Sequence, residues 1–248
     1  SPLTTLSRGD LVEIQGPPSS GKTHLLCHLV GTCVLPTSVG GWNKAAILFD
    51  VDGTLDVVRI RHLLHTRILR ARPPTTDDDR NAGQSSKLLS QALRNFRIFR
   101  PSSSLQLAAT LSNLQTYHAE DMPSSELALL AIDSMSAFYW TDRFAAEDRR
   151  APPPGISKSS TPSSAQNALH VILEALQRIR TSHGPVIALT NWGLSPQHSH
   201  GAAAGLPAYK RHLHPFPTLI APNTPDPSPR LDIYPPLTHH ITLYPPSV

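Results

Sequence analysis

Residues 16–23, Gly-Pro-Pro-Ser-Ser-Gly-Lys-Thr, match the phosphate-loop pattern G-x-x-x-x-G-K-[ST] at every constrained position. Its glycines let the backbone turn tightly, so that amide groups converge on phosphate oxygens. Residues 10–15 predict a strand entering the loop, and residues 23–30 predict a helix whose positive N-terminus faces the phosphates. This context disfavours a chance Gly/Ser/Pro turn. The predicted nucleotide-binding residues are Gly16, Pro17, Pro18, Ser19, Ser20, Gly21, Lys22, Thr23 and His24.

The rest of the chain alternates short apolar runs with segments of helical periodicity, which predicts an α/β fold with a mainly parallel central sheet between helices. The expected strands are residues 44–50, 96–99, 127–133 and 186–190, and the expected helices are residues 56–70, 87–93, 102–118 and 165–181. The helix at 102–118 has three candidate caps, Ser102, Ser103 and Ser104.

We expect one core over residues 1–214 and a proline-rich tail over 215–248 with a closing strand at 239–244. Within the core we expect a flexible insertion at 73–86 and long loops at 138–164 and 192–214. The 25 prolines are unevenly placed, with three in a row at 152–154 and a dense series from Pro207 to Pro246, and continuous helix or central strand is excluded in those stretches.

Composition limits the function only weakly. A formal net charge of +4 is compatible with a nucleic-acid partner without selecting one. The two cysteines are too few for a disulfide framework, no apolar run reaches membrane-spanning length, and no signal peptide is recognisable. We therefore expect an intracellular protein with no membrane partner.

Carboxylates at strand ends are the next candidates for chemistry. Asp133 ends a buried strand, where an acid holds Mg²⁺ together with the Thr23 hydroxyl. Asp50 and Asp52 follow another buried strand, and Asp52 is the predicted catalytic carboxylate that orients water. Residues 50–55 also match the D-x-D-G-T-[LV] nucleophile pattern of haloacid-dehalogenase phosphatases, but the downstream Lys and acidic pair of those enzymes are not found.

A metal site is the alternative use of the helix after the loop. His24, Cys27, His28 and Cys33 lie close together there, which suggests zinc. Helices that follow phosphate loops often bury cysteine and expose histidine, and this second interpretation is favoured.

Three stretches, residues 9–23, 47–52 and 129–143, resemble the ATPase core of the eukaryotic RecA-type recombinase paralogues. The similarity covers about residues 9–142, returns at 186–191 and is thin beyond His212. The resemblance implies ATP and Mg²⁺ as cofactors, homologous recombination in the nucleus, assembly with other paralogues into a hetero-oligomer, and binding of single-stranded or branched DNA.

In this family two loops contact DNA, and they correspond to residues 138–164 and 192–214 here. The residues implied by the resemblance are Tyr139, Trp140, Arg143, Arg149, Arg150, Lys210 and Arg211. The arginines and the lysine suit phosphates, and the aromatic rings suit base stacking. The alternatives are solvated cations, and aromatic rings that are buried or that contact a partner subunit.

The chain departs from active recombinases at three points. Asp52 stands where they carry Glu, Trp192 stands where Gln usually follows the polar strand end Asn191, and no N-terminal helical domain precedes Ser7. These departures favour an accessory subunit that binds nucleotide weakly or hydrolyses it slowly. Two alternatives stay open, a self-sufficient DNA-stimulated ATPase that exchanges strands and a scaffold whose phosphate loop binds nothing.

Overall fold

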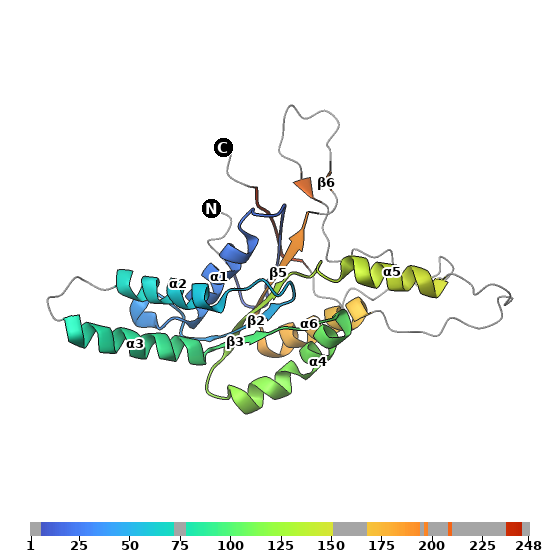
Figure 1. Cartoon of the computed structure of the whole chain (residues 1–248). Coiled ribbons are helices and arrows are strands. Elements are labelled where there is room, and N and C mark those ends of the chain that lie inside the picture. The colour runs from blue at the N-terminus through green and yellow to red at the C-terminus, as the bar shows by residue number, and fades with distance from the viewer. Residues whose placement is uncertain are drawn as a thin grey trace.

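The computed structural model describes residues 6–71, 78–150, 168–193, 196–197, 208–209 and 237–244. At its centre is a six-stranded sheet in which all neighbouring strands are parallel (Figure 1). In the order β3-β2-β4-β5-β1-β8, the strands are Phe96–Phe99, Ala45–Asp50, Leu127–Asp133, Val186–Trp192, Leu11–Gly16 and His239–Thr242. The predicted α/β class with a parallel central sheet is confirmed.

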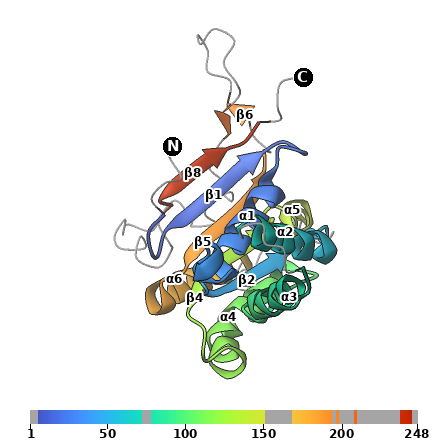
Figure 2. The same ribbon diagram turned by 90° about the vertical axis from the view of Figure 1, so that its left-hand side faces the viewer.

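Helices cover both faces of this sheet, so the molecule has three layers (Figure 2). The helices α1, α2 and α3 lie over one face, and α4 and α6 pack together over the other. In chain order the helices are α1 (Lys22–Val34), α2 (Val57–Arg70), α3 (Asp78–Arg94), α4 (Ser104–Asp121), α5 (Tyr139–Arg150) and α6 (Ala168–His183). A 3₁₀ turn, Thr37–Val39, follows α1.

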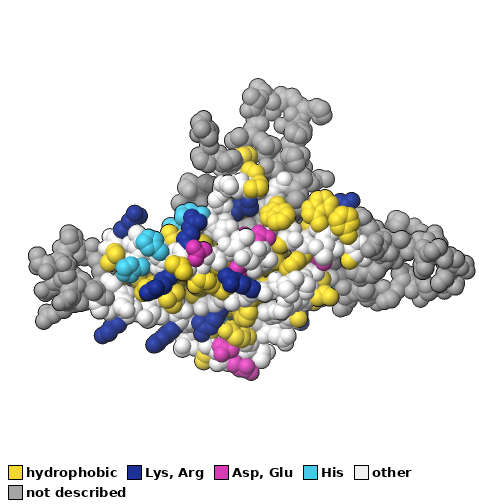
Figure 3. All heavy atoms as spheres, in the orientation of Figure 1, with side chains coloured by type: hydrophobic (Ala, Val, Ile, Leu, Met, Phe, Trp, Pro, Cys, Tyr) yellow, Lys and Arg dark blue, Asp and Glu magenta, His cyan; other side chains and the backbone are white. Residues whose placement is uncertain are grey.

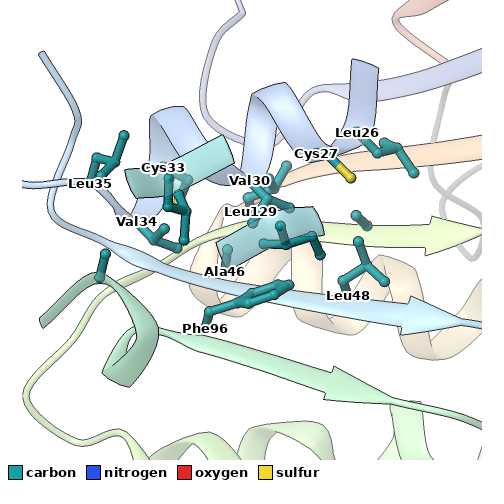
Figure 4. Close-up of a cluster of buried hydrophobic side chains, with 14 of the residues drawn as sticks. Leu26, Cys27, Val30, Cys33, Val34, Leu35, Ala46, Leu48, Phe96 and Leu129 are labelled. Atoms are coloured by element: carbon teal, nitrogen blue, oxygen red, sulfur yellow. The ribbon is translucent and has the colours of Figure 1, made fainter. Parts of the chain in front are cut away.

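The strand β2 shows why the apolar runs in the sequence are continuous. Its residues Ala46 and Leu48 join the cluster beneath α1 that Figure 4 shows. Ile47 and Phe49 join the cluster on the opposite face. Because helices cover both faces, every position of the strand is buried and apolar side chains are favoured at each one.

Helix starts follow local hydrogen-bonding chemistry. The Asp56 carboxylate caps α2 by accepting hydrogen bonds from the backbone N–H groups of Val58 at 2.8 Å and Arg59 at 3.2 Å. Of the three serines predicted as candidate caps of α4, the structure uses Ser103, whose hydroxyl accepts from Gln106 N at 3.2 Å.

The predicted flexible insertion at 73–86 is wrong from Asp78 onward, because α3 already begins there. Ser85, Leu89 and Ala92 of α3 are buried, and α3 packs against α2. This packing stabilises a helix whose polar first turns carry no apolar signal, since extending an existing helix costs little. Residues 73–77 lie outside the described residues.

The predicted loop at 138–164 is also wrong over its first part, because Tyr139–Arg150 form the helix α5. An acid in the first turn, Asp142, suits the helix dipole, and its carboxylate accepts a hydrogen bond from the Ser104 hydroxyl at 2.8 Å. Residues 151–164 lie outside the described residues.

Of the loop predicted at 192–214, Trp192 belongs to β5, and two short antiparallel strands, β6 (Pro196–Gln197) and β7 (Ala208–Tyr209), form a separate pair. Most other residues of this loop, and of the tail up to residue 236, lie outside the described residues.

The closing strand β8 is joined to the edge of the central sheet, parallel to β1. The Thr238 hydroxyl accepts from Leu11 N at 2.8 Å and donates to Leu11 O at 2.9 Å, and the His239 ring lies 3.2 Å from the Asp10 carboxylate. This segment of the tail therefore covers the open edge of the strand that leads into the phosphate loop.

We expect Phe49→Ala to lower the free energy of unfolding by roughly 3–5 kcal/mol, because the buried ring of Phe49 stacks on Phe99 and its removal leaves a cavity. Urea denaturation measures the change. The same substitution at Phe144, which is 59% exposed, is the matched control and should stay within about 0.5 kcal/mol of the wild type. Equal losses in the two variants would contradict the assignment of Phe49 to the core.

Candidate nucleotide-binding site

The phosphate loop lies between β1 and α1 and depends on two glycines. Gly21 has a φ of +91°, a backbone angle that residues with a Cβ atom rarely adopt. A Cβ atom on Gly16 would lie 2.5 Å from both the Ser20 hydroxyl and the Leu243 carbonyl oxygen. Gly21 is the N-cap of α1 and supplies no side-chain hydrogen bond, so the helix start offers its backbone N–H groups to an anion. The loop therefore fits a polyphosphate.

The half-buried Lys22 side chain folds back over the loop. Its Nζ atom donates hydrogen bonds to the carbonyl oxygens of Gly16 and Pro17, both at 2.8 Å. Burial lowers the pKa of Lys22, and the nearby carboxylates of Asp133 and Asp52 oppose that change. The cation therefore lies between the loop and the two acids.

Thr23 and Asp133 meet directly at the carboxyl edge of the sheet. The Thr23 hydroxyl donates to Oδ2 of Asp133 at 2.7 Å. These residues come from α1 and β4. The strand β5 lies between β1 and β4, and its Thr190 hydroxyl donates to the other oxygen of Asp133. Hydroxyl and carboxylate oxygens are ligands that suit Mg²⁺.

Asp52 lies beside this pair and is half-buried. Burial raises the pKa of Asp52, the carboxylates of Asp133 and Asp50 add to the rise, and hydrogen bonds from Ser134 and Trp192 oppose it. The Ser134 hydroxyl lies 3.3 Å from Oδ1 of Asp52. Asp52 is thus held by its neighbours at the edge of the site.

The Asp50 carboxylate, in contrast, is occupied by hydrogen bonds that hold the fold together. This fully buried carboxylate accepts hydrogen bonds from Thr54 N at 3.1 Å, Leu55 N at 3.2 Å and Arg100 Nε at 2.8 Å. Because both oxygens are engaged, the carboxylate is poorly placed to attack phosphorus. This geometry argues against the phosphatase alternative.

The four residues considered for zinc separate by burial. Cys27 and Cys33 point into the core beneath α1 (Figure 4), whereas His24 and His28 are exposed. Over the parts of the chain that the structure describes, no group of three His, Cys, Asp or Glu side chains is arranged to hold a metal. Burial raises the pKa of Cys27, and it raises that of Cys33 to about 12.

Both thiols should therefore be protonated and unreactive in the native protein, since the thiolate is the reactive form. We expect a thiol reagent such as Ellman's reagent to modify neither cysteine at neutral pH without denaturant, and to modify both of the two cysteines in urea. Release of zinc together with the thiols on unfolding would contradict the core assignment.

Three of the residues implied to contact DNA lie in the first two turns of α5. Trp140 is 46% exposed, and the Arg143 guanidinium lies 5.6 Å from the centre of its ring, while Tyr139 packs edge-on against Trp140. Figure 3 shows hydrophobic side chains at the surface where α5 begins. Arg149 and Arg150 belong to the last turn of α5, and Lys210 and Arg211 lie outside the described residues.

Three residues near the carboxyl edge of the sheet were not predicted from the sequence. Thr190 and Ser134 bind the two acids, and Arg100 neutralises Asp50. Thr190 carried a usable signal, because it is a polar residue at the end of an apolar strand. Arg100 carried none, since its partner is 50 residues away along the chain.

Among the described residues, the structure contains no helix of the length and apolar character needed to span a membrane.

Comparison with known proteins places this chain beside DNA repair proteins. It is 28% identical to DNA repair protein XRCC2 of Mus musculus over 194 residues, which are 78% of this chain and 60% of that protein. It is 28% identical to an XRCC2 homolog of Arabidopsis thaliana over 211 residues, 75% of this chain and 55% of that protein. DNA repair protein RAD51 of Saccharomyces cerevisiae is 25% identical over 186 residues, 74% of this chain and 37% of that protein.

The chain thus spans little more than half the length of the two XRCC2-type relatives. No family model matches it.

Proposed function

We propose that this chain, a RecA-type recombinase paralogue similar to XRCC2, binds ATP and Mg²⁺ and serves as an accessory subunit in homologous-recombination repair of DNA double-strand breaks. The observation that carries the nucleotide part is the 2.7 Å hydrogen bond between Thr23 and Asp133. It joins the threonine of the phosphate loop to an acid at the end of β4, and this pair of oxygen groups suits Mg²⁺ beside bound phosphates.

Nucleotide binding would use the loop residues 16–23 and the start of α1. Backbone N–H groups and Lys22 would hold the phosphates, and Thr23 with Asp133 would hold the metal ion through oxygen ligands. Bound Mg²⁺ supplies positive charge beside the phosphates. Asp133 is kept in place for this role by Thr190, which binds its other oxygen.

Slow hydrolysis is the property that separates an accessory subunit from a self-sufficient recombinase. Asp52 would position water, but its side chain is a methylene shorter than Glu, and it is held by Ser134 and Trp192. These features support ATP binding with little turnover.

The partners in this role would be DNA and other recombinase paralogues. The exposed aromatic residues at the start of α5 can stack on bases of single-stranded or branched DNA, and Arg143 can contact phosphate. The relatives are DNA repair proteins, which supports assembly with other recombinase paralogues and a nuclear location.

ATP binding and turnover test the nucleotide part. We expect Lys22→Ala to weaken binding of a fluorescent ATP analogue at least tenfold, because a charged hydrogen-bond donor contributes roughly 1.5–3 kcal/mol. Lys87→Ala on α3, which removes an exposed lysine, is the matched control and should bind like the wild type. Asp133→Asn should abolish the gain in affinity that Mg²⁺ provides.

Turnover then distinguishes the alternatives. An accessory subunit should hydrolyse ATP slowly with or without DNA, and Asp52→Glu should raise the rate. Rapid DNA-stimulated hydrolysis by the wild type would favour the self-sufficient recombinase, and no ATP binding at all would leave only the scaffold.

DNA binding has its own test. We expect Trp140→Ala to weaken binding of fluorescent oligo(dT) by roughly fivefold or more, because stacking contributes about 1–3 kcal/mol per base. Trp42→Ala is the control. Trp42 has a similar exposure of 44%, but it lies just before the amino end of β2, whereas α5 follows the carboxyl end of β4. Equal affinities for the Trp140→Ala and Trp42→Ala variants would remove α5 from the proposed DNA contact.

A further inference from the structure

Trp192, the last residue of β5, is bound to Asp52, the carboxylate that is proposed to position water. Its indole N–H, the only hydrogen-bond donor in a tryptophan side chain, donates to the Asp52 carboxylate. The Ser134 hydroxyl donates to Oδ1 of the same carboxylate at 3.3 Å. Two donors from different segments of the chain thus bind one half-buried acid.

The strand order shows how Trp192 reaches Asp52. The strand β4 lies between β5, which ends at Trp192, and β2, which Asp52 follows. Neighbouring strands are about 4.8 Å apart, so the ends of β5 and β2 are separated by roughly 10 Å. The two side chains and the hydrogen bond between them cover this distance. The contact therefore passes over the end of β4, where Asp133 lies.

Side-chain alternation places Trp192 on the nucleotide side of the sheet. Residues two apart in a strand point to the same face, so Trp192 shares a face with Thr190. The Thr190 hydroxyl donates to Asp133, which also accepts from Thr23 of α1. The indole therefore approaches Asp52 from the side of α1 and the phosphate loop. In the proposed function, the phosphates and the attacking water lie on this side.

Backbone hydrogen bonds fix the end of β5 in this position. Trp192 N donates at 2.8 Å to the hydroxyl of Ser136, which is buried. The next N–H group, that of Gly193, donates at 3.2 Å to Gly16 O of the phosphate loop. Figure 1 shows the arrow of β5 ending between α1 and α5. The indole is thus carried by a backbone that is tied to the phosphate loop on one side and to the segment before α5 on the other.

We propose that Trp192 is a positioning residue that holds Asp52 away from the attacking water and so keeps ATP turnover low, an inference that rests on the proposed ATP site. A carboxylate that positions water must accept a hydrogen bond from it on the side that faces the phosphates. The indole N–H approaches Asp52 from that side. Water can use the acid there only after the indole is displaced, and removal of one N–H group should lift this restraint.

The opposite role, in which Trp192 would orient Asp52 for catalysis, fits the geometry less well. A residue that orients a catalytic carboxylate supports it from behind and is itself locked by packing. Ser134 meets this description, because it is fully buried. Trp192 is 38% exposed and lies on the open side of the site, where its ring excludes water from the acid.

Trp192→Phe tests the proposal, because it removes the indole N–H and keeps an aromatic ring and every backbone hydrogen bond. We expect kcat for ATP hydrolysis by the full chain to rise roughly fivefold or more, since water no longer competes with a donor bound to a charged group. KM should stay within about twofold of the wild type, because the indole binds the acid and not the substrate. Trp42→Phe, at a residue 44% exposed before β2, is the matched control.

The Asp52→Asn background shows whether Trp192 acts through the acid. Single-turnover rates should then be the same with Trp192 or Phe at this position, because two residues that act through one contact are not additive. A gain of equal size in both backgrounds would overturn the proposal. A fall in kcat for Trp192→Phe would also overturn it, in favour of the orienting role.

Tryptophan fluorescence tests the contact without turnover. The chain has three tryptophans, so replacing Trp42 and Trp140 by Phe leaves Trp192 as the single emitter. Asp52→Asn should shift its emission maximum, because it removes a charge from the partner of the indole N–H. An unchanged emission maximum would overturn the proposal.

ATP binding separates this inference from the proposed function. A wild-type chain that binds ATP, with Trp192→Phe hydrolysing it no faster than Trp42→Phe, would overturn the inference and leave the proposed function standing. Weaker ATP binding by Trp192→Ala with an unchanged kcat would overturn the inference in favour of a direct contact between the ring and the nucleotide. A wild-type chain that did not bind ATP would overturn both.

Discussion

The hydrogen bond between Thr23 and Asp133 is the contact on which the arrangement of the site depends. The two residues are 110 positions apart in the chain, and only the parallel register of β4, β5 and β1 brings their elements to the same edge. Thr190, from the strand between them, holds the second oxygen of the same carboxylate. Three segments thus converge on one acid, and a shift of any strand by one residue would turn its polar side chain to the other face.

Burial of both faces of the sheet makes this convergence stable. The strands β2 and β4 carry their acids at their carboxyl ends, because the rest of their length lies between helices. Asp50 shows what burying a charge requires, since its carboxylate is matched by Arg100 and by two backbone N–H groups. Within the described part of the chain the neighbouring Asp52 forms no ion pair with an arginine, and burial raises its pKa.

The exposed functional groups are distributed over different layers. The carboxyl edge carries loop amides and oxygen atoms, α5 carries exposed aromatic rings, and α2 carries guanidinium groups. The helix α1 connects two of them, since it begins at the phosphate loop and is bridged to α2 through Arg67. Its buried side, with Cys27 and Cys33, is fixed in the core, so its exposed histidines keep a constant position beside the arginines of α2.

The sequence by itself determined the phosphate loop, the parallel α/β class and the acids at the strand ends, because these depend on local patterns of glycine, continuous apolar runs and polar residues that end them. It failed over 78–86 and 139–150, where helices form although the local composition favours loops, since packing of α3 on α2 and the contact from Ser104 to Asp142 come from distant residues. Only the tertiary structure placed β5 between β1 and β4, paired Arg100 with Asp50 and gathered the basic groups of α1 and α2. The physical reason is that strand order and side-chain contacts between distant segments are decided by the packing of the whole core, which no single stretch of sequence encodes.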